Sequence, residues 1–177
     1  MTRLELEHLI RSAGAISGDD EIVIVGSQSI LGQFPHAPVA LLASMEADVF
    51  PLNRPDHSDL IDGSIGEGSQ FHEHFGYYAQ GVSEDTATLP GDWRRRLFAV
   101  SNPNTRGITG LCLDVHDLAI SKYVAGRPKD LEFTQQLAAY GLAKQEVLLE
   151  RLADTQVSDV IRKIVQQRIA GHFAKKI

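Results

Sequence analysis

Three groups of residues along this 177-residue chain have types and spacings that suit phosphate chemistry. The first is a corner, where the β-branched run Glu21 to Val25 leads directly into Gly26-Ser27. Glycine lets a backbone approach a ligand closely, and the N–H groups of a following helical turn attract anions. The corner therefore predicts a phosphate-binding turn, and an ordinary turn is the alternative that the same residues allow.

The second group is a pair of acids in the segment SMEADVF. If this segment is a strand, Glu46 and Asp48 share one face while Ala47 and Val49 point to the other. Two rises place the two Cα atoms about 6.5 Å apart. Their oxygens can converge on a hard cation, and Mg²⁺ is the usual choice beside nucleotide phosphates. The alternative to a metal site is a solvent-facing edge strand, on which the two acids are hydrated and have no function.

The third group lies in DVHDLAISKYVAGRPKD. On a helical wheel Lys122 falls in the middle of an apolar arc, so its side chain either snorkels to the surface or is directed into a cleft. Arg127 precedes Pro128, which favours an extended backbone at Arg127. Lys129 and Asp130 then fall in the first turn of the next helix. The helix dipole suits Asp130 there but not Lys129, which hints at another role for the lysine.

Other chemistry-bearing residues have simpler interpretations. The His72-Glu73-His74 segment resembles a metal motif, but its histidines diverge on a helix, which favours a surface. The segment Arg94 to Arg96 after Trp93 either grips an RNA backbone, with the indole as a stacking surface, or pairs with nearby acids. Cys112, inside an apolar run, is predicted to be a core residue.

Composition narrows the class of protein. The net charge is −6, which argues against a protein wrapped in nucleic acid. Residues 151–177 hold six Lys or Arg against two acids, so the first 150 residues carry eleven basic and 21 acidic side chains. The basic end could meet an anionic partner, or it could be a solvated helix face. No apolar run reaches the ~18 residues of a membrane span. With a single cysteine, these features predict a cytoplasmic protein without disulfides.

The elements that would position these residues change in type along the chain. Helical periodicity at the N-terminus is followed by predicted strands at 21–25, 47–52, 77–82, 96–100 and 107–113, with helical pieces over 28–31 and 56–75. From Asp114 the period is helical, over 114–125, 128–140 and 158–172. The sequence predicts an α+β fold, a small mixed sheet flanked by helices with a helical C-terminal half. The expected division is a core of residues 1–113 and a helical region of residues 114–177 that completes the cleft.

In this order the three groups resemble the nucleotidyltransferase superfamily, specifically the AbiEii-type nucleotidyltransferase toxin family. The resemblance covers roughly residues 20–140, and its most recognisable segments are PGDWRRRL and GLCLDVHDLAISKYVAGRPKDLEF. It rests on the Gly26-Ser27 corner, the Glu46-Ala47-Asp48 strand and the pattern K-x4-R-x-K-D, which is met by Lys122, Arg127, Lys129 and Asp130. Two departures are the 18 residues between Ser27 and Glu46 and the Glu at the first acidic position, where Asp is commoner.

The resemblance implies a nucleotide held between sheet and helical half. Gly26 and Ser27 would hold the triphosphate, Glu46 and Asp48 would bind one or two Mg²⁺ ions, and Asp48, Lys122 and Asp130 would be catalytic. Lys122 would also bind the nucleotide, with Arg127 and Lys129 as phosphate or RNA contacts. Asp114 is the candidate for a third acid.

The resemblance also implies an activity, which is metal-dependent transfer of a nucleotide from an NTP to RNA, perhaps the 3′ end of tRNA. The protein would be the toxin of a bacterial toxin–antitoxin pair, with a cognate antitoxin as partner and no membrane. Two alternatives stay open. One is a nucleotide-binding regulator that has lost turnover, and the other transfers a nucleotide to a small-molecule antibiotic.

Overall fold

A computed structural model describes residues 1–174 of the chain. The chain folds into two compact units. The first unit contains Met1–Thr86 and Arg96–Asp114. The second contains Ala87–Arg95 and the chain from Val115 onward. Lys175 and Lys176, two of the cations counted in the basic C-terminal end, lie outside the described residues.

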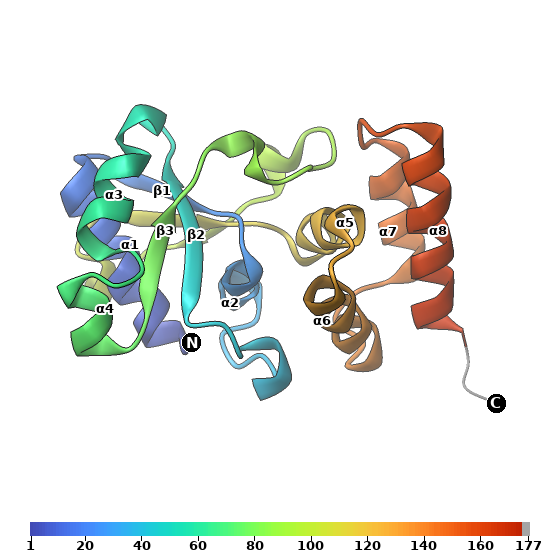
Figure 1. Cartoon of the computed structure of the whole chain (residues 1–177), viewed down its shortest axis with the longest axis horizontal. Helices are drawn as coiled ribbons and strands as arrows, with labels where there is room; N and C mark the ends of the chain where they lie inside the picture. Colours follow the sequence, from blue (N-terminus) through green and yellow to red (C-terminus); the bar gives the residue numbers. More distant parts are fainter. Residues whose placement is uncertain (175–177) are drawn as a thin grey trace. The chain divides into compact units, whose positions relative to one another are not determined.

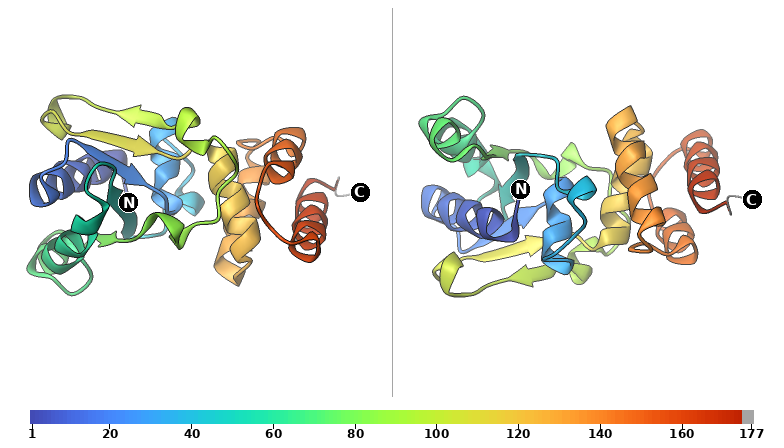
Figure 2. Two further views of the ribbon diagram at one scale, coloured as in Figure 1. Left: turned by 90° about the horizontal axis from the view of Figure 1, so that it is seen from above. Right: turned by 90° about the horizontal axis from the view of Figure 1, so that it is seen from below.

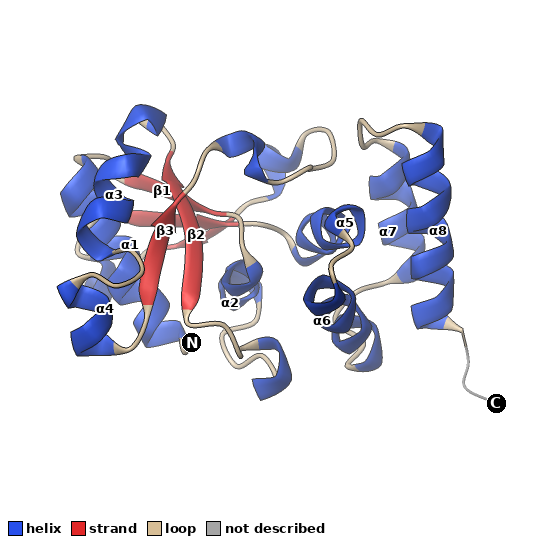
Figure 3. Cartoon of the chain, viewed as in Figure 1, coloured by secondary structure: helices blue, strands red, loops and turns tan. Residues whose placement is uncertain are grey.

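The first unit is built on a mixed sheet whose strands, within the described residues, follow the order β3-β2-β1-β5-β4 (Figures 1 and 3). The central strand β1 pairs antiparallel with β2 and parallel with β5. At the edges, β3 runs parallel to β2 and β4 runs antiparallel to β5. The strand bounds are β1 Glu21–Ile24, β2 Glu46–Pro51, β3 Tyr78–Gly81, β4 Phe98–Val100 and β5 Thr109–Cys112.

The helices of this unit are α1 (Arg3–Ser17), α2 (Ile30–Gln33), α3 (Ser58–Ile65) and α4 (Gln70–Phe75). Short 3-10 turns join them: η1 (Ser27–Ser29), η2 (Val39–Leu41), η3 (Pro55–His57), η4 (Glu84–Thr86) and η6 (Pro103–Thr105). Thr2 and Glu5 form a capping box that starts α1, and Gly18 ends it at φ 67°. Both views of Figure 2 show α1 running between α3 and the β4–β5 pair.

One face of the sheet is covered by α1 and α3. Glycines on the sheet show where the helices approach, since a Cβ on Gly110 would meet Ile10 Cδ1 of α1 at 2.3 Å. A Cβ on Gly81 would meet the Ser58 carbonyl oxygen of α3 at 1.9 Å. Gly81 lies opposite Val49, and residues directly opposite each other point to the same face. The face that carries Ala47 and Val49 is therefore the helix-covered face.

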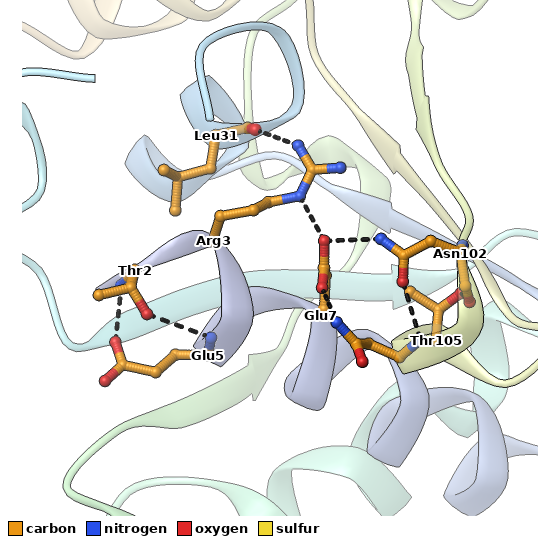
Figure 4. Close-up of polar contacts among 8 residues, drawn as sticks. Thr2, Arg3, Glu5, Glu7, Leu31, Asn102 and Thr105 are labelled. Atoms are coloured by element: carbon orange, nitrogen blue, oxygen red, sulfur yellow. Dashed lines mark hydrogen bonds and ion pairs between the residues drawn. The ribbon is translucent and has the colours of Figure 1, made fainter. Parts of the chain in front are cut away.

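The buried carboxylate of Glu7 fixes α1 to the loop before β5, as Figure 4 shows. It accepts hydrogen bonds from Arg3 Nε at 2.9 Å, Asn102 Nδ2 at 2.8 Å and Asn104 Nδ2 at 2.9 Å. Burial alone would raise the pKa of Glu7, but the hydrogen bonds from Asn104, Asn102 and Arg3 outweigh it and hold the pKa below its usual value. The ionised carboxylate therefore stabilises the fold.

We expect Glu7→Gln to lower the free energy of unfolding at pH 7 by about 1.5–3 kcal/mol, the worth of hydrogen bonds to a charged group. Because the folded pKa is depressed, this loss is fully present above the ordinary glutamate value and fades as the pH falls through the folded value. Urea melts between pH 3 and pH 7 measure it. The exposed acid Glu73 gives the matched control, Glu73→Gln, for which we expect no comparable loss.

The second unit is helical, with α5 (Val115–Ala125), α6 (Pro128–Ala139), α7 (Gln145–Ala153) and α8 (Asp159–Phe173). Its fifth part is the segment Ala87–Arg95, which leads into the 3-10 turn η5 (Trp93–Arg96). Ser158 caps α8 by accepting a hydrogen bond from Ile161 N. No helix of the described residues is long and apolar enough to cross a membrane.

The α+β fold with a helical C-terminal half is confirmed, and so are the predicted strands and most helices. The 18 residues between Ser27 and Glu46 are accommodated by α2 and η2. The sequence reading missed α7 entirely. Lys144 stands at its N-cap without a side-chain hydrogen bond, so the start of this helix has no capping signal in the sequence.

Candidate functional site

The Gly26-Ser27 corner is held by the acidic strand beside it. After β1 ends at Ile24, Val25 N donates to the carbonyl of Asp48 at 3.0 Å, and Ser29 N donates to the carbonyl of Gly26 at 3.0 Å. Gly26 thus stands at the N-cap of η1 with φ −81° and ψ −174°, an extended geometry that any residue can adopt. Backbone conformation therefore does not require glycine here.

The Asp48 side chain is what requires glycine at position 26. A Cβ built on Gly26 would lie 1.9 Å from Asp48 Oδ2 and 2.8 Å from Asp48 Cγ. These distances are far inside van der Waals contact, so the carboxylate occupies the space that any larger residue would need. The structure thereby brings together the corner and the acid that the sequence placed 22 positions apart.

Glu46 and Asp48 share one face of β2 with the buried Phe50, and Ala47 and Val49 point to the opposite face. Along β2 they are half-buried, while Ala47 and Val49 are at most 1 % exposed. Because α1 and α3 cover the Ala47 and Val49 face, the two carboxylates lie on the other face of the sheet. The predicted alternation is confirmed. It leaves two acids side by side on a face that neither of these helices covers.

Tyr78 is a member of this site that sequence reasoning missed. It lies directly opposite Glu46 in the β2–β3 register, and its hydroxyl donates to Glu46 Oε2 at 3.4 Å. The ring contacts His72 with centroids 4.5 Å apart. Burial raises the pKa of the Tyr78 hydroxyl, and the charges of Glu46, Glu67 and Asp48 raise it further. The hydroxyl therefore stays protonated and able to donate to the carboxylate.

The carboxylates of Glu46 and Asp48 are suitable ligands for a metal ion that nucleotide phosphates also bind. Within residues 1–174 no group of three or more His, Cys, Asp or Glu side chains could hold one, so neither Asp114 nor the His72–His74 segment completes such a cluster. Mg²⁺ beside a nucleotide is commonly bound through one or two carboxylates, with phosphate oxygens and waters as its other ligands. Glu46 and Asp48 fit that requirement.

Two buried polar groups follow the corner without partners among the described residues. Gln28 Oε1 and Ser29 Oγ belong to side chains that are fully buried, and neither makes a hydrogen bond. A buried polar group left without a partner costs about 1–3 kcal/mol, so Gln28 and Ser29 are candidates for contact with a bound ligand. Polar groups kept at such a cost are commoner at functional sites than elsewhere.

In the second unit, Lys122 and Arg127 converge on Asp130. Lys122 Nζ lies 3.3 Å from Asp130 Oδ1, and Arg127 Nε lies 2.6 Å from Asp130 Oδ2. Asp130 is 1 % exposed, whereas Arg127 at the N-cap of α6 is exposed. Burial would raise the pKa of Asp130, but the Arg127 hydrogen bond and the two positive charges hold it below its usual value. Lys122 is therefore fixed by an ion pair.

These contacts define what each sequence-predicted residue can do. Asp130 is shielded from solvent and held by two cations, an arrangement that orients Lys122 and Arg127. Lys129, the next residue to Asp130, is exposed. Gly26, Ser27, Glu46 and Asp48 belong to the first unit, and Lys122, Arg127, Lys129 and Asp130 belong to the second. That both groups act on one nucleotide stays a prediction.

The contacts of the other candidate residues, Cys112 and the arginines after Trp93, are simpler to describe. Cys112 is fully buried, and burial raises the pKa of its thiol to about 12, as expected of a core cysteine. Arg95 pairs with Asp92 at 3.5 Å while both side chains stay largely exposed. Arg94 lies over the Trp93 ring, with Cζ 5.4 Å from its centroid.

Comparison with known proteins agrees with this geometry. No curated protein and no solved structure gave a significant match to the chain. One family does match, over residues 4–174, and its description is "Nucleotidyltransferase of unknown function (DUF6036)". That range includes the Gly-Ser corner, the acidic strand and the Lys122 to Asp130 cluster. The chain therefore belongs to this nucleotidyltransferase family.

Proposed function

We propose that this protein is a Mg²⁺-dependent nucleotidyltransferase that transfers a nucleotide from an NTP to an RNA acceptor. The observation that carries the proposal is the packing of the Asp48 carboxylate on the Cα of Gly26, at the corner where β1 ends. This contact joins an anion-binding turn to an acidic strand face, which are the two elements that a nucleoside triphosphate and its metal require.

Each residue has a part in the proposed reaction. The backbone at Gly26 and the Ser27 hydroxyl bind the triphosphate, and the carboxylates of Glu46 and Asp48 hold Mg²⁺. Lys122 and Arg127, oriented by Asp130, neutralise phosphate charge, with Lys129 as an exposed additional contact. The acceptor hydroxyl forms a bond to the α-phosphorus, the bond to pyrophosphate breaks, and the hydroxyl proton passes to solvent. Positioning and electrostatics account for most catalysis in such transfers. Bound Mg²⁺ would neutralise the charge that develops on the pyrophosphate.

The direct test is incubation of the protein with each α-labelled NTP, Mg²⁺ and total RNA. We expect label to enter RNA with one NTP preferred, and to be lost when EDTA is added. Separation of the products by size tells whether tRNA is the acceptor. Absence of transfer from all four NTPs to every RNA class, with protein shown to be folded, would sink the proposal.

A toxin role is the finer part of the proposal, and it rests on the resemblance to the AbiEii-type family. We expect induced expression to arrest bacterial growth, and we expect co-expression of the neighbouring gene to relieve the arrest. If a protein that is active in the transfer assay leaves growth unaffected, the toxin role is wrong and the enzymatic activity stands.

Two specific observations favour other functions. Within residues 1–174 there is no three-acid cluster, which favours a nucleotide-binding regulator without turnover. Nucleotide binding without transfer to any acceptor would support it. The first unit carries 15 Asp or Glu against five Lys or Arg, which suits a cationic antibiotic as acceptor. Label on an aminoglycoside in the absence of RNA would support that alternative.

Tyr78 should act as a positioning residue for Glu46. Loss of a hydrogen bond behind a metal ligand typically weakens metal affinity about 10- to 100-fold. We therefore expect Tyr78→Phe to raise the Mg²⁺ concentration required for half-maximal transfer by about tenfold. Mn²⁺ binding to the protein alone, followed by electron paramagnetic resonance, should weaken in parallel. Tyr140→Phe, at an exposed tyrosine of the second unit, is the matched control. Equal Mn²⁺ affinity in the Tyr78 variant and wild type would contradict this role.

A further inference from the structure

The segment Ala87–Arg95 interrupts the sequence of the first unit but packs within the second. Its attachment point is the α7–α8 junction. Gly91 N donates to the carbonyl of Asp154 at 2.9 Å, and Pro90 forms an isolated β-bridge with Thr155. Pro90 and Thr155 are both buried. A Cβ on Gly91 would lie 2.5 Å from Asp154 Oδ2, so the Asp154 side chain lies against the Gly91 backbone. The segment is thus fixed at its base.

Directly after this anchor the chain presents an aromatic ring with two exposed cations. Trp93 is half-buried, and the side chains of Arg94 and Arg95 are exposed. The Arg94 guanidinium lies over the Trp93 ring, 5.4 Å from its centroid. The partner of Arg95 is Asp92, at 3.5 Å with 81 % and 67 % of the two side chains exposed, a geometry that contributes little in water. The arrangement is accessible and held in place by the anchor.

Five other cations of the second unit make contacts within it. Arg162 donates to the carbonyls of Leu152 and Thr155, and Arg168 donates to that of Tyr123. Arg151 pairs with the fully buried Asp117, while Lys122 and Arg127 pair with Asp130. Arg94 and Arg95 have exposed side chains next to Trp93 in the sequence, and Arg94 lies over its ring.

The sign of the charge differs between the two units. By sequence the first unit has 15 acids and five cations, and the second has eight acids and 12 cations. A polyanionic acceptor is attracted to the second unit and repelled by the first. An indole with a guanidinium over its ring, followed by a second exposed arginine, provides a stacking surface for a base and contacts for its phosphates. Stacking requires a base that is not already in a duplex, which favours single-stranded RNA over a helix.

We infer that Trp93, Arg94 and Arg95 form the site that binds a single-stranded segment of the RNA acceptor. The inference rests on the proposed function and names the form of its substrate. Trp93 stacks on an unpaired base, while Arg94 and Arg95 contact the phosphates on either side of it. Hereafter these three residues are called the Trp93 platform.

The chain contains one tryptophan, so fluorescence excited at the red edge of its absorption, where the four tyrosines do not absorb, reports on Trp93 alone. The first experiment titrates the wild-type protein with a single-stranded 12-mer RNA in EDTA without NTP, which separates binding from catalysis. We expect saturable quenching of the Trp93 emission and much weaker quenching by a duplex of the same length. Unchanged emission at RNA concentrations where filter binding shows a complex would overturn the inference, as would the absence of any complex.

The second experiment measures the affinity of variants with a fluorescein-labelled 12-mer by anisotropy. We expect Trp93→Ala to weaken binding about 5- to 150-fold, the range of one lost base stack, and Trp93→Phe to recover part of it. Arg94→Gln with Arg95→Gln should lower the slope of log affinity against log salt by about 1.4, from two lost single-strand phosphate contacts. Lys163→Gln, at an exposed lysine of α8, is the matched control and should behave like wild type.

Kinetics distinguish failure of this inference from failure of the proposed function. If the platform is correct, Trp93→Ala raises the KM for RNA and leaves the KM for NTP unchanged. If that variant transfers nucleotide to RNA with an unchanged KM, the RNA-binding role of the Trp93 platform is wrong and the proposed enzymatic activity stands. If RNA binding depends on Trp93 but no acceptor is modified, the RNA-binding role stands and the proposed enzymatic activity is wrong. Thermal melts of every variant confirm that the fold is retained.

Discussion

Gly26→Ala should abolish most nucleotidyl transfer, with a fall in kcat/KM for NTP of about 10²-fold or more. The new Cβ would stand 1.9 Å from Asp48 Oδ2, so either the corner or the carboxylate must move. A displacement of about 1 Å at a reacting centre is enough for a loss of this size. Steady-state transfer assays with the preferred NTP measure it, and Mn²⁺ binding shows whether the Asp48 carboxylate has been displaced.

The control for Gly26→Ala is a second Gly→Ala change in the same unit. Gly63 lies inside α3, and nothing stands within 4 Å of a Cβ built there. Gly63→Ala should leave transfer unchanged and raise the free energy of unfolding by roughly 0.5–1 kcal/mol, since alanine is the better helix former. Wild-type activity in the Gly26 variant would show that the Asp48 contact has no part in catalysis.

Asp48→Asn should lower transfer by about 10²- to 10³-fold, the cost of removing one preorganised electrostatic partner from a reacting centre. The substitution keeps the shape of the side chain and its packing on Gly26, and it removes only the charge. It also removes repulsion between Asp48 and Glu46, which share one strand face. We therefore expect the Tm to stay level or rise while activity falls, as is common when a functional residue is neutralised.

Comparison with Asp20→Asn separates the loss of a particular carboxylate from a change in net charge. Asp20 is exposed and belongs to the same unit, so both variants change the charge of that unit equally. Transfer assays and thermal melts on the pair, at several Mg²⁺ concentrations, complete the test. A loss of transfer in Asp48→Asn that excess Mg²⁺ fully restores would place Asp48 in metal affinity alone, and an undiminished rate would exclude it from the site.

Local patterns predicted much of the site because its parts lie on single elements. The alternation of Glu46 and Asp48 with Ala47 and Val49 fixes which face of β2 carries the acids, since successive side chains of a strand point to opposite faces. The proline after Arg127 places that residue outside the helix that follows. Each of these inferences depends on neighbours within a few positions in the sequence.

Partners from distant segments could not be predicted in this way. Tyr78 reaches Glu46 because of the β2–β3 register, and register is set by the packing of the whole sheet. Local sequence explains Asp130 by the helix dipole, and the K-x4-R-x-K-D pattern groups it with Lys122 and Arg127 only by resemblance. The structure shows the ion pairs that join it to Lys122, eight positions earlier, and to Arg127. Helix α7 was missed because its boundaries lack caps and its formation depends on tertiary packing.

The sequence by itself determined the order of the elements, the α+β class and the types of residue that the nucleotide site would use. Only the tertiary structure showed what a side chain at position 26 would displace, since the obstacle is a carboxylate from another strand and not the backbone angles. It likewise decided that the Trp93 platform belongs to the helical unit, through contacts with Asp154 and Thr155. Periodicity is a local property of the chain, whereas close approach depends on how distant segments pack.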